Sequence, residues 1–182
     1  MSIEQVRRFV GRTDVFSIQL PSGIYVPVKR EITDKDLEEH LSGKTTIGCY
    51  VIKKSGLAKF GVIDIDKSPE EVDYAVRLGE SIMLLFPDFD RVLETSGRRG
   101  CHIWVFMKQD ETPRFIRNLI KTRLKLGGFS DKIEVFPKQD RITEGGFGNL
   151  VKLPLGKHKL GGWSKIIKEE IALSPVQKEV PK

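Results

Sequence analysis

An apolar strand that ends in two acidic residues is the feature that most constrains this chain. The segment reads Phe60-Gly-Val-Ile-Asp-Ile-Asp66, so Asp64 and Asp66 stand two positions apart. Side chains at i and i+2 of a strand point to the same face of a sheet, which places both carboxylates side by side. Because burying an unpaired charge is costly, the pair must face cations or emerge where the strand reaches the surface. Two oxygen ligands on a rigid strand suit Mg²⁺ or Mn²⁺, although strands also commonly end in solvated aspartate.

The composition limits the class of protein. The chain has 182 residues, of which 39% are hydrophobic, enough for one domain with its own core. It contains no run of about 18 apolar residues and no apolar signal segment at its start, so we expect a cytoplasmic protein with no membrane partner. Cys49 and Cys101 form no Cys-x-x-Cys motif and predict neither a zinc knuckle nor a disulfide framework. The net charge of +6 permits binding to a polyanion without requiring it.

The first 44 residues predict a small N-terminal α/β module. A short helix is expected over residues 3–10, followed by strands over 15–20 and 24–29 that form a hairpin around Pro21-Ser22-Gly23. Thr33 then caps a helix that ends near Leu41, with Gly43 as its stop signal.

Residues 45–173 predict a mostly antiparallel sheet with helices on one face, and the fold class is therefore α+β. Strands over 45–53 and 58–64 are expected to form a hairpin, and Ser68-Pro69 starts a helix that runs to Phe86. Strands at 91–94 and 101–107 flank a loop, a helix runs from Thr112 to about residue 127, and strands at 132–136 and 149–153 follow. We expect a single domain over 1–182, a frayed tail over 174–182, and a second sheet face that is free for a site.

Three strands each carry a polar residue on a face that its neighbours make apolar. They are the strands of the acidic pair, of His102 in Gly100-Cys-His-Ile-Trp-Val-Phe106, and of Glu134 in Ile133-Glu-Val-Phe136. Taken singly, His102 is typical of a hydrogen-bonded core histidine and Glu134 of an edge-strand charge. Taken together, three carboxylates can hold two divalent cations about 3.5–4 Å apart.

Basic residues border this acidic group, an arrangement typical of phosphoryl transfer, in which cations neutralise phosphate oxygens. The loop over residues 96–100 suits a phosphate because its glycines admit backbone N–H groups and its arginines add bidentate contacts, although a basic hairpin turn has the same composition. Metal hydrolases usually use more histidine ligands than His40, His102 and His158 supply. The bordering basic residues are Arg98, Arg99, Lys138, Lys152, Lys157 and His158.

In their order along the chain, these motifs resemble those of the archaeo-eukaryotic primase superfamily. The resemblance spans about residues 9–162, and Glu134 stands where many members carry aspartate. Its segments are Val62-Ile-Asp-Ile-Asp66, Ser96-Gly-Arg-Arg-Gly-Cys-His102, Ile133-Glu-Val-Phe-Pro-Lys138, and the basic stretch Asn149-Leu-Val-Lys-Leu-Pro-Leu-Gly-Lys-His158.

Within the superfamily, the chain looks most like the primase-polymerases of mobile-element conflict systems and CRISPR loci. Residues 40–48, 134–139 and 148–150 carry this narrower likeness. The sequence shows no zinc-binding or helical accessory module, so the resemblance favours nucleotide addition more than primer initiation. The resemblance implies two kinds of partner. One is an accessory zinc-binding or helical module within a longer protein, and the other is a set of CRISPR or mobile-element proteins.

The resemblance implies the superfamily's catalytic core, with a sheet like that of an RNA-recognition motif. The implied activity is a DNA-templated nucleotidyltransferase that adds NTPs or dNTPs to a primer on single-stranded DNA. Two Mg²⁺ or Mn²⁺ ions would be held by the catalytic residues Asp64, Asp66 and Glu134. The implied nucleotide-binding residues are Ser96, Arg98, Arg99, His102, Lys138, Lys152 and His158.

Two other classes of function stay open. The first is a non-catalytic module that binds single-stranded nucleic acid by stacking bases on aromatic residues of an open sheet face. Here carboxylates occupy that face and would repel phosphate unless metal is present. The second is a metal-dependent nuclease or phosphohydrolase, which needs a positioned water. Lengthening of a primer, as opposed to its shortening, separates these classes.

Overall fold

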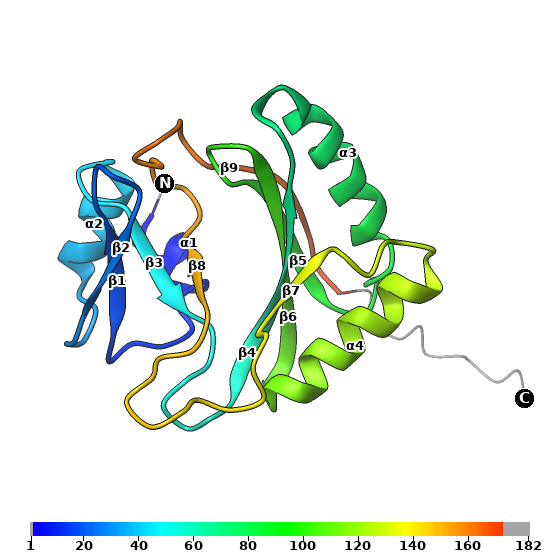
Figure 1. Ribbon diagram of the computed structural model, residues 1–182, viewed down its shortest axis with the longest axis horizontal. Coiled ribbons are helices and arrows are strands. Elements are labelled where there is room, and N and C mark those ends of the chain that lie inside the picture. The colour runs from blue at the N-terminus through cyan, green and yellow to red at the C-terminus, as the bar shows by residue number, and fades with distance from the viewer. Residues whose placement is uncertain (1, 173–182) are drawn as a thin grey trace, which may run out of the picture.

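Two antiparallel sheets lie side by side in the computed structural model, with two helices on the outer side of one of them (Figure 1). The structure describes residues 2–172. The tail expected over 174–182 lies outside these residues. Within residues 2–172, no helix combines the length and the apolar character that crossing a membrane requires.

The first sheet has the strand order β2-β1-β3-β8. Its strands are β1 (Phe16–Gln19), β2 (Tyr25–Val28), β3 (Ile47–Tyr50) and β8 (Leu150–Lys152), and the expected β1–β2 hairpin is confirmed. Two helices accompany it, α1 (Ile3–Arg7) and α2 (Asp34–Leu41). The Thr33 side chain accepts from the Asp36 N–H in a capping box, so α2 begins where its sequence signal predicts.

The expected hairpin between residues 45–53 and 58–64 is wrong. A tight turn does form there, with the Lys53 N–H donating to the Leu57 carbonyl at 2.8 Å. It carries the chain from one sheet to the other, because β3 pairs with β1 and β8 and not with the following strand. Every residue of β3 is buried, so its sequence lacks the alternation that identifies a partner and a register. The first sheet therefore includes β3 and β8, which lie beyond the expected N-terminal module of residues 1–44.

The second sheet has the strand order β7-β4-β6-β5-β9, all antiparallel. The series β4-α3-β5-β6-α4-β7 with this order is the expected RNA-recognition-type arrangement, and the α+β class is confirmed. The last strand, β9, was not predicted. The elements are β4 (Ala58–Asp66), a 3₁₀ turn (Pro69–Glu71), α3 (Val72–Met83), β5 (Asp90–Thr95), β6 (Gly100–Glu111), α4 (Pro113–Leu126), β7 (Glu134–Phe136) and β9 (Lys165–Glu170).

Helices α3 and α4 cover one face of the second sheet (Figure 1). The approach of α4 depends on Gly61, where a Cβ would overlap the side chains of Ile116 and Ile120. On the α3 side, the Cys101 thiol donates to the Ala75 carbonyl at 3.2 Å. Where α3 and α4 pack against the strands, this face is therefore closed to a ligand.

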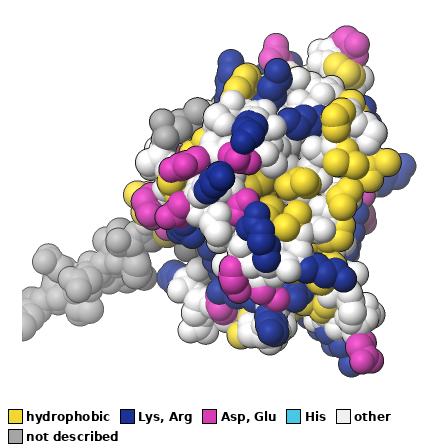
Figure 2. Space-filling model, turned by 90° about the vertical axis from the view of Figure 1, so that its left-hand side faces the viewer, with side chains coloured by type: hydrophobic (Ala, Val, Ile, Leu, Met, Phe, Trp, Pro, Cys, Tyr) yellow, Lys and Arg dark blue, Asp and Glu magenta, His cyan; other side chains and the backbone are white. Residues whose placement is uncertain are grey.

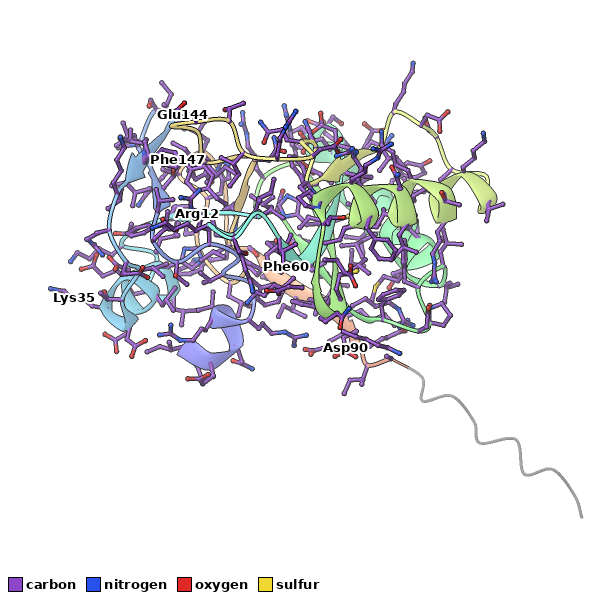
Figure 3. All side chains as sticks on the ribbon, turned by 90° about the horizontal axis from the view of Figure 1, so that it is seen from below. Arg12, Lys35, Phe60, Asp90, Glu144 and Phe147 are labelled. Atoms are coloured by element: carbon purple, nitrogen blue, oxygen red, sulfur yellow. The ribbon has the colours of Figure 1, made fainter. Side chains whose placement is uncertain are left out.

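An aromatic cluster covers part of the opposite face, which faces the first sheet. The Trp104 ring makes edge contacts with Phe9 and Phe60 at centroid distances of 5.0 and 4.9 Å. Phe60 lies between the two sheets (Figure 3). The expectation of a free second face therefore holds only at the end of the strands that carries the acidic pair.

The outer surface beside the first sheet carries mixed charge. In the view of Figure 2, Lys and Arg side chains are interspersed with Asp and Glu, and hydrophobic side chains gather beside them. Positive charge on this face is thus interrupted by negative charge, which disfavours it as a track for a polyanion.

Candidate active site

The strand register places four polar side chains in one row across the second sheet. Glu134 of β7 lies opposite Asp64 of β4, Asp64 lies opposite His102 of β6, and His102 lies opposite Glu94 of β5. Directly opposed residues of antiparallel strands have side chains on the same face. The structure thus brings together Asp64, His102 and Glu134, and Asp66 stands two positions beyond the row on the same strand.

Glu94 is the centre of a buried hydrogen-bond network. Its Oε1 lies 2.7 Å from His102 Nδ1 and accepts from Trp104 Nε1 at 3.3 Å, and its Oε2 accepts from the Ser164 hydroxyl. Glu94 is fully buried and His102 is 7% exposed. Burial alone would lower the pKa of His102, but the hydrogen bond and charge of Glu94, with the charge of Asp64, raise it above the usual value.

The charge of Lys152 also acts on Glu94. Burial tends to raise the pKa of Glu94, yet the charge of Lys152 and the hydrogen bond to His102 outweigh it and keep that pKa below its usual value. Burial lowers the pKa of Lys152, and Glu94 opposes this. The Lys152 Nζ donates to the Leu153 carbonyl at 2.7 Å. The buried carboxylate of Glu94 thus stabilises the charged forms of both His102 and Lys152.

Glu94 and Ser164 were not predicted from the sequence. Glu94 carries the same signal that identified Glu134, an acidic residue within an apolar strand (Val92-Leu-Glu-Thr95), and could have been found. Ser164 gives no such signal, because its contact with Glu94 joins segments 70 positions apart.

The three predicted metal ligands differ in their surroundings. Asp66 accepts from Arg99 Nη2 at 2.6 Å, and Glu134 accepts from Lys138 Nζ at 2.8 Å, with all four side chains about half exposed. Asp64 Oδ1 is buried and has no hydrogen-bond partner among residues 2–172. His102 Nε2 lies 3.6 Å from this oxygen.

Asp64 is the least compensated charge of the group. Burial raises the pKa of Asp64, His102 opposes the shift, and the charges of Asp66 and Glu134 add to it. An oxygen with this environment is a fitting cation ligand, and carboxylates are the donors that Mg²⁺ and Mn²⁺ prefer. Within the described chain, however, no three His, Cys, Asp or Glu side chains converge closely enough to hold an ion. The metal-ligand assignment therefore stays a prediction.

The glycine-rich loop between β5 and β6 is held by backbone contacts. The Ser96 N–H donates to the Gly100 carbonyl at 2.8 Å, which closes the loop. Gly97 has a φ of +83°, and its carbonyl accepts from the Gly162 N–H at 2.6 Å. A Cβ at Gly100 would overlap a backbone oxygen of β4. Glycine is therefore required at both positions, and the two arginines between them project at the site.

The site lies in a cavity of about 170 Å³ between the two sheets. The acidic residues of its lining, Asp64 and Asp66, belong to the second sheet, and Lys152 belongs to β8 of the first sheet. Of the predicted nucleotide-binding residues, only Lys138 lies outside it. The lining residues are Tyr25, Asp64, Asp66, Ser96, Arg98, Arg99, His102, Phe136, Leu150, Val151, Lys152 and His158.

The other two histidines have different environments. Burial, followed by the charges of Lys152 and Arg98, lowers the pKa of His158 to about 4, so it is neutral at pH 7. Its Nδ1 accepts from the Leu160 N–H at 3.0 Å, and its Nε2 lies 3.2 Å from Gln19 Nε2. His40 is buried outside the cavity, where its Nδ1 accepts from the Ile47 N–H at 3.0 Å and its Nε2 lies 2.9 Å from the Pro154 carbonyl. His40 is thus a structural residue.

The fold and this site together define a catalytic domain of the archaeo-eukaryotic primase type. Residues 5–175 match the family described as the TOTE conflict system, archaeo-eukaryotic primase domain, and the chain belongs to that family. The resemblance to conflict-system primases is thereby confirmed. No curated protein matches the chain. The family indicates a primase-polymerase-like nucleotidyltransferase.

Proposed function

We propose that the protein is a DNA-templated nucleotidyltransferase that adds NTPs or dNTPs to a primer. The observation that carries this proposal is the opposition of charges within one cleft. Asp64 and Asp66 occupy one wall, while Arg98 and Lys152 line the remainder. This combination suits a substrate in which a polyphosphate must be held beside a group that reacts.

The cavity between the sheets would take the triphosphate. Its volume of about 170 Å³ is below the roughly 300–1,000 Å³ of pockets that enclose a whole drug-sized ligand, so it suits the phosphate chain better than a complete nucleotide. The two loop arginines and Lys152 provide positive charge, and Ser96 provides a hydroxyl. With its Nδ1 hydrogen-bonded to Glu94, His102 has Nε2 left to donate to a phosphate oxygen.

Divalent cations fit the acidic wall by the chemistry of its donors. Asp64, Asp66 and Glu134 would hold Mg²⁺ or Mn²⁺, which when bound stabilises negative charge on the reacting oxygens. The cations would replace Arg99 and Lys138 as partners of two of these carboxylates, since both ion pairs are half exposed. Arg99 would then be released to contact phosphate.

The proposed partners are a primer annealed to single-stranded DNA and, outside this chain, an accessory domain or other conflict-system proteins. The family to which the chain belongs supports this proposal. Initiation from two free nucleotides is a further activity that the same site would permit.

The experiment that tests the proposal follows an end-labelled primer on a single-stranded template, with Mg²⁺ or Mn²⁺ and either nucleotide set. We expect templated lengthening by the wild type and none by an Asp64→Ala, Asp66→Ala double variant. Asp110→Ala is the matched control, because Asp110 pairs with Lys53 away from the cleft. Shortening of the primer would indicate a nuclease, and DNA binding without lengthening would indicate a non-catalytic module. Either result would contradict the proposal.

A further inference from the structure

A second, larger cavity lies against the same acidic pair. Its volume is about 710 Å³, and it shares only Asp64, Asp66 and Arg99 with the first cavity. The chain therefore has two separate spaces that meet at its proposed reacting group. The second cavity is lined by Asp64, Ile65, Asp66, Lys67, Tyr74, Leu78, Arg99, Gly128, Phe129, Ser130, Lys132, Ile133 and Glu134.

The two cavities lie on different sides of the end of β4. The pairing of β7 with β4 stops at Asp64, so no described strand pairs with that edge of β4 at Ile65 and Asp66. The second cavity occupies this position, between α3 and the segment that joins α4 to β7. In Figure 1, these helices lie on one side of the second sheet and the first sheet lies on the other. The carboxylates thus separate the cavities.

The charge of the second cavity differs from that of the first. Its walls hold three acidic residues and three basic ones, Lys67, Arg99 and Lys132, whereas the first cavity has two acidic residues against three Arg and Lys. A polyphosphate is therefore favoured in the first cavity. The second suits a ligand with one phosphodiester charge and an uncharged group that can approach the carboxylates.

Aromatic side chains give the second cavity a surface for a base. The Tyr74 side chain is 48% exposed, and the Lys67 Nζ lies 5.2 Å from the centre of its ring. Phe129 is half buried on the opposite wall. Nucleic-acid bases stack on such rings independently of sequence, while lysines contact the backbone. The volume of about 710 Å³ lies within the roughly 300–1,000 Å³ of small-molecule pockets.

We propose that the second cavity holds the 3′-terminal nucleotide of the primer, with its base against Tyr74 and its 3′-hydroxyl directed at Asp64 and Glu134. This inference rests on the proposed nucleotidyl transfer. In that reaction the 3′-oxygen forms a bond to the α-phosphorus while the bond from that phosphorus to the bridging oxygen breaks. Pyrophosphate leaves, and the hydroxyl proton passes to water. Attacking and leaving oxygens stand roughly in line, so the primer end must approach from the side opposite the triphosphate.

The test measures binding to the full chain, without turnover, of a fluorescent primer–template whose primer ends in a normal or an abasic 3′-nucleotide. The variants are Tyr74→Ala, Tyr74→Phe and, as a matched surface aromatic that lines neither cavity, Phe115→Ala. We expect loss of the terminal base or of the Tyr74 ring to weaken binding about 5- to 150-fold. The two losses combined should weaken it little more than either alone, because both remove the same contact. Tyr74→Phe and Phe115→Ala should bind like the wild type.

The proposal would be overturned if the losses of affinity caused by Tyr74→Ala and by the abasic nucleotide multiply when the two are combined. It would also be overturned if Tyr74→Ala binds the primer–template as tightly as the wild type. A higher KM for the nucleotide at unchanged primer affinity would also overturn it, because the cavity would then hold the incoming base. Coupled binding without extension would support the cavity assignment and contradict the nucleotidyl transfer. Extension without coupled binding would support the nucleotidyl transfer and contradict the cavity assignment. Failure of the one proposal can therefore be distinguished from failure of the other.

Discussion

Removal of Glu94 should destabilise the protein and impair its proposed nucleotide site together. Glu94 is fully buried and accepts from Trp104 and Ser164 as well as pairing with His102. Glu94→Ala leaves His102 and Lys152 buried without their counter-charge. Breaking a buried pair in this way costs about 3–5 kcal/mol, a large part of the roughly 5–15 kcal/mol that stabilises a typical domain. Glu94→Gln should cost less, about 1–2 kcal/mol, because neutral hydrogen bonds remain when charge-assisted ones are lost.

The assay is urea-induced unfolding at pH 7, with Glu169→Ala as the control. Glu169 lies on the edge strand β9 and pairs with Arg8 at the surface, and such pairs contribute about 0–1 kcal/mol. A free energy of unfolding for Glu94→Ala within about 1 kcal/mol of wild type would show that Glu94 does not stabilise the buried His102 and Lys152. In primer extension, Glu94→Gln should raise the KM for the nucleotide while primer affinity is unchanged, since His102 loses its orienting charge. An effect on kcat alone would assign Glu94 a different role.

Three further predictions concern His40, a loop glycine and the acidic pair. Burial, then the charge of Lys152, lowers the pKa of His40 to about 4. Between pH 6.5 and 4, His40 therefore binds a proton in the unfolded chain but stays neutral in the folded chain. Stability should fall across that window by about 3 kcal/mol, and His40→Asn should lack this part of the pH dependence in urea titrations. Gly100→Ala should destabilise by at least about 1–3 kcal/mol, because a Cβ overlaps the backbone of β4, whereas Gly162→Ala, which meets no close neighbour, should not. Asp64→Asn should raise the free energy of unfolding by about 1–3 kcal/mol, because it removes a carboxylate whose buried Oδ1 has no hydrogen-bond partner among residues 2–172. Mn²⁺ should raise the melting temperature of the wild type only, and an Asp64→Asn protein that Mn²⁺ still stabilises would contradict the assigned ligand.

Elements with signals in their own sequence were predicted correctly. Thr33 and Thr112 cap α2 and α4 through hydrogen bonds to N–H groups three positions on. These contacts lie within one helical turn, so a short window of sequence contains all their determinants. Helix α3 follows in the same way from Ser68-Pro69, although its first turn is 3₁₀.

Strand partners were not predictable in the same way. The turn at residues 53–57 signals a reversal of the chain, but it does not specify that the flanking strands pair. Strand β3 is buried throughout, so its sequence fits either sheet. Its partner β8 lies about 100 positions later, and only packing of the complete chain selects it.

The site also combines residues that could be predicted from local sequence with residues that could not. Asp64, His102 and Glu134 were identified because each interrupts an apolar strand, and the register then places them in one row. The first sheet's contribution to the cavity, Tyr25 and the three residues of β8, depends on how the two sheets meet. Its basic side chain and the resemblance suggested Lys152, whereas nothing in the sequence around Tyr25 relates it to the acidic strand.

One side chain joins the core to the site. The Trp104 ring is fully buried between Phe9 and Phe60, and its Nε1 donates to Glu94, the partner of His102. Its position is therefore fixed by close packing on one side and by a hydrogen bond on the other. Since Phe9 precedes the first sheet and Phe60 belongs to the second, the cluster sets the spacing of the sheets and the orientation of the site histidine at once. A substitution that loosens the aromatic core would thus misplace His102 without touching any residue of the cleft.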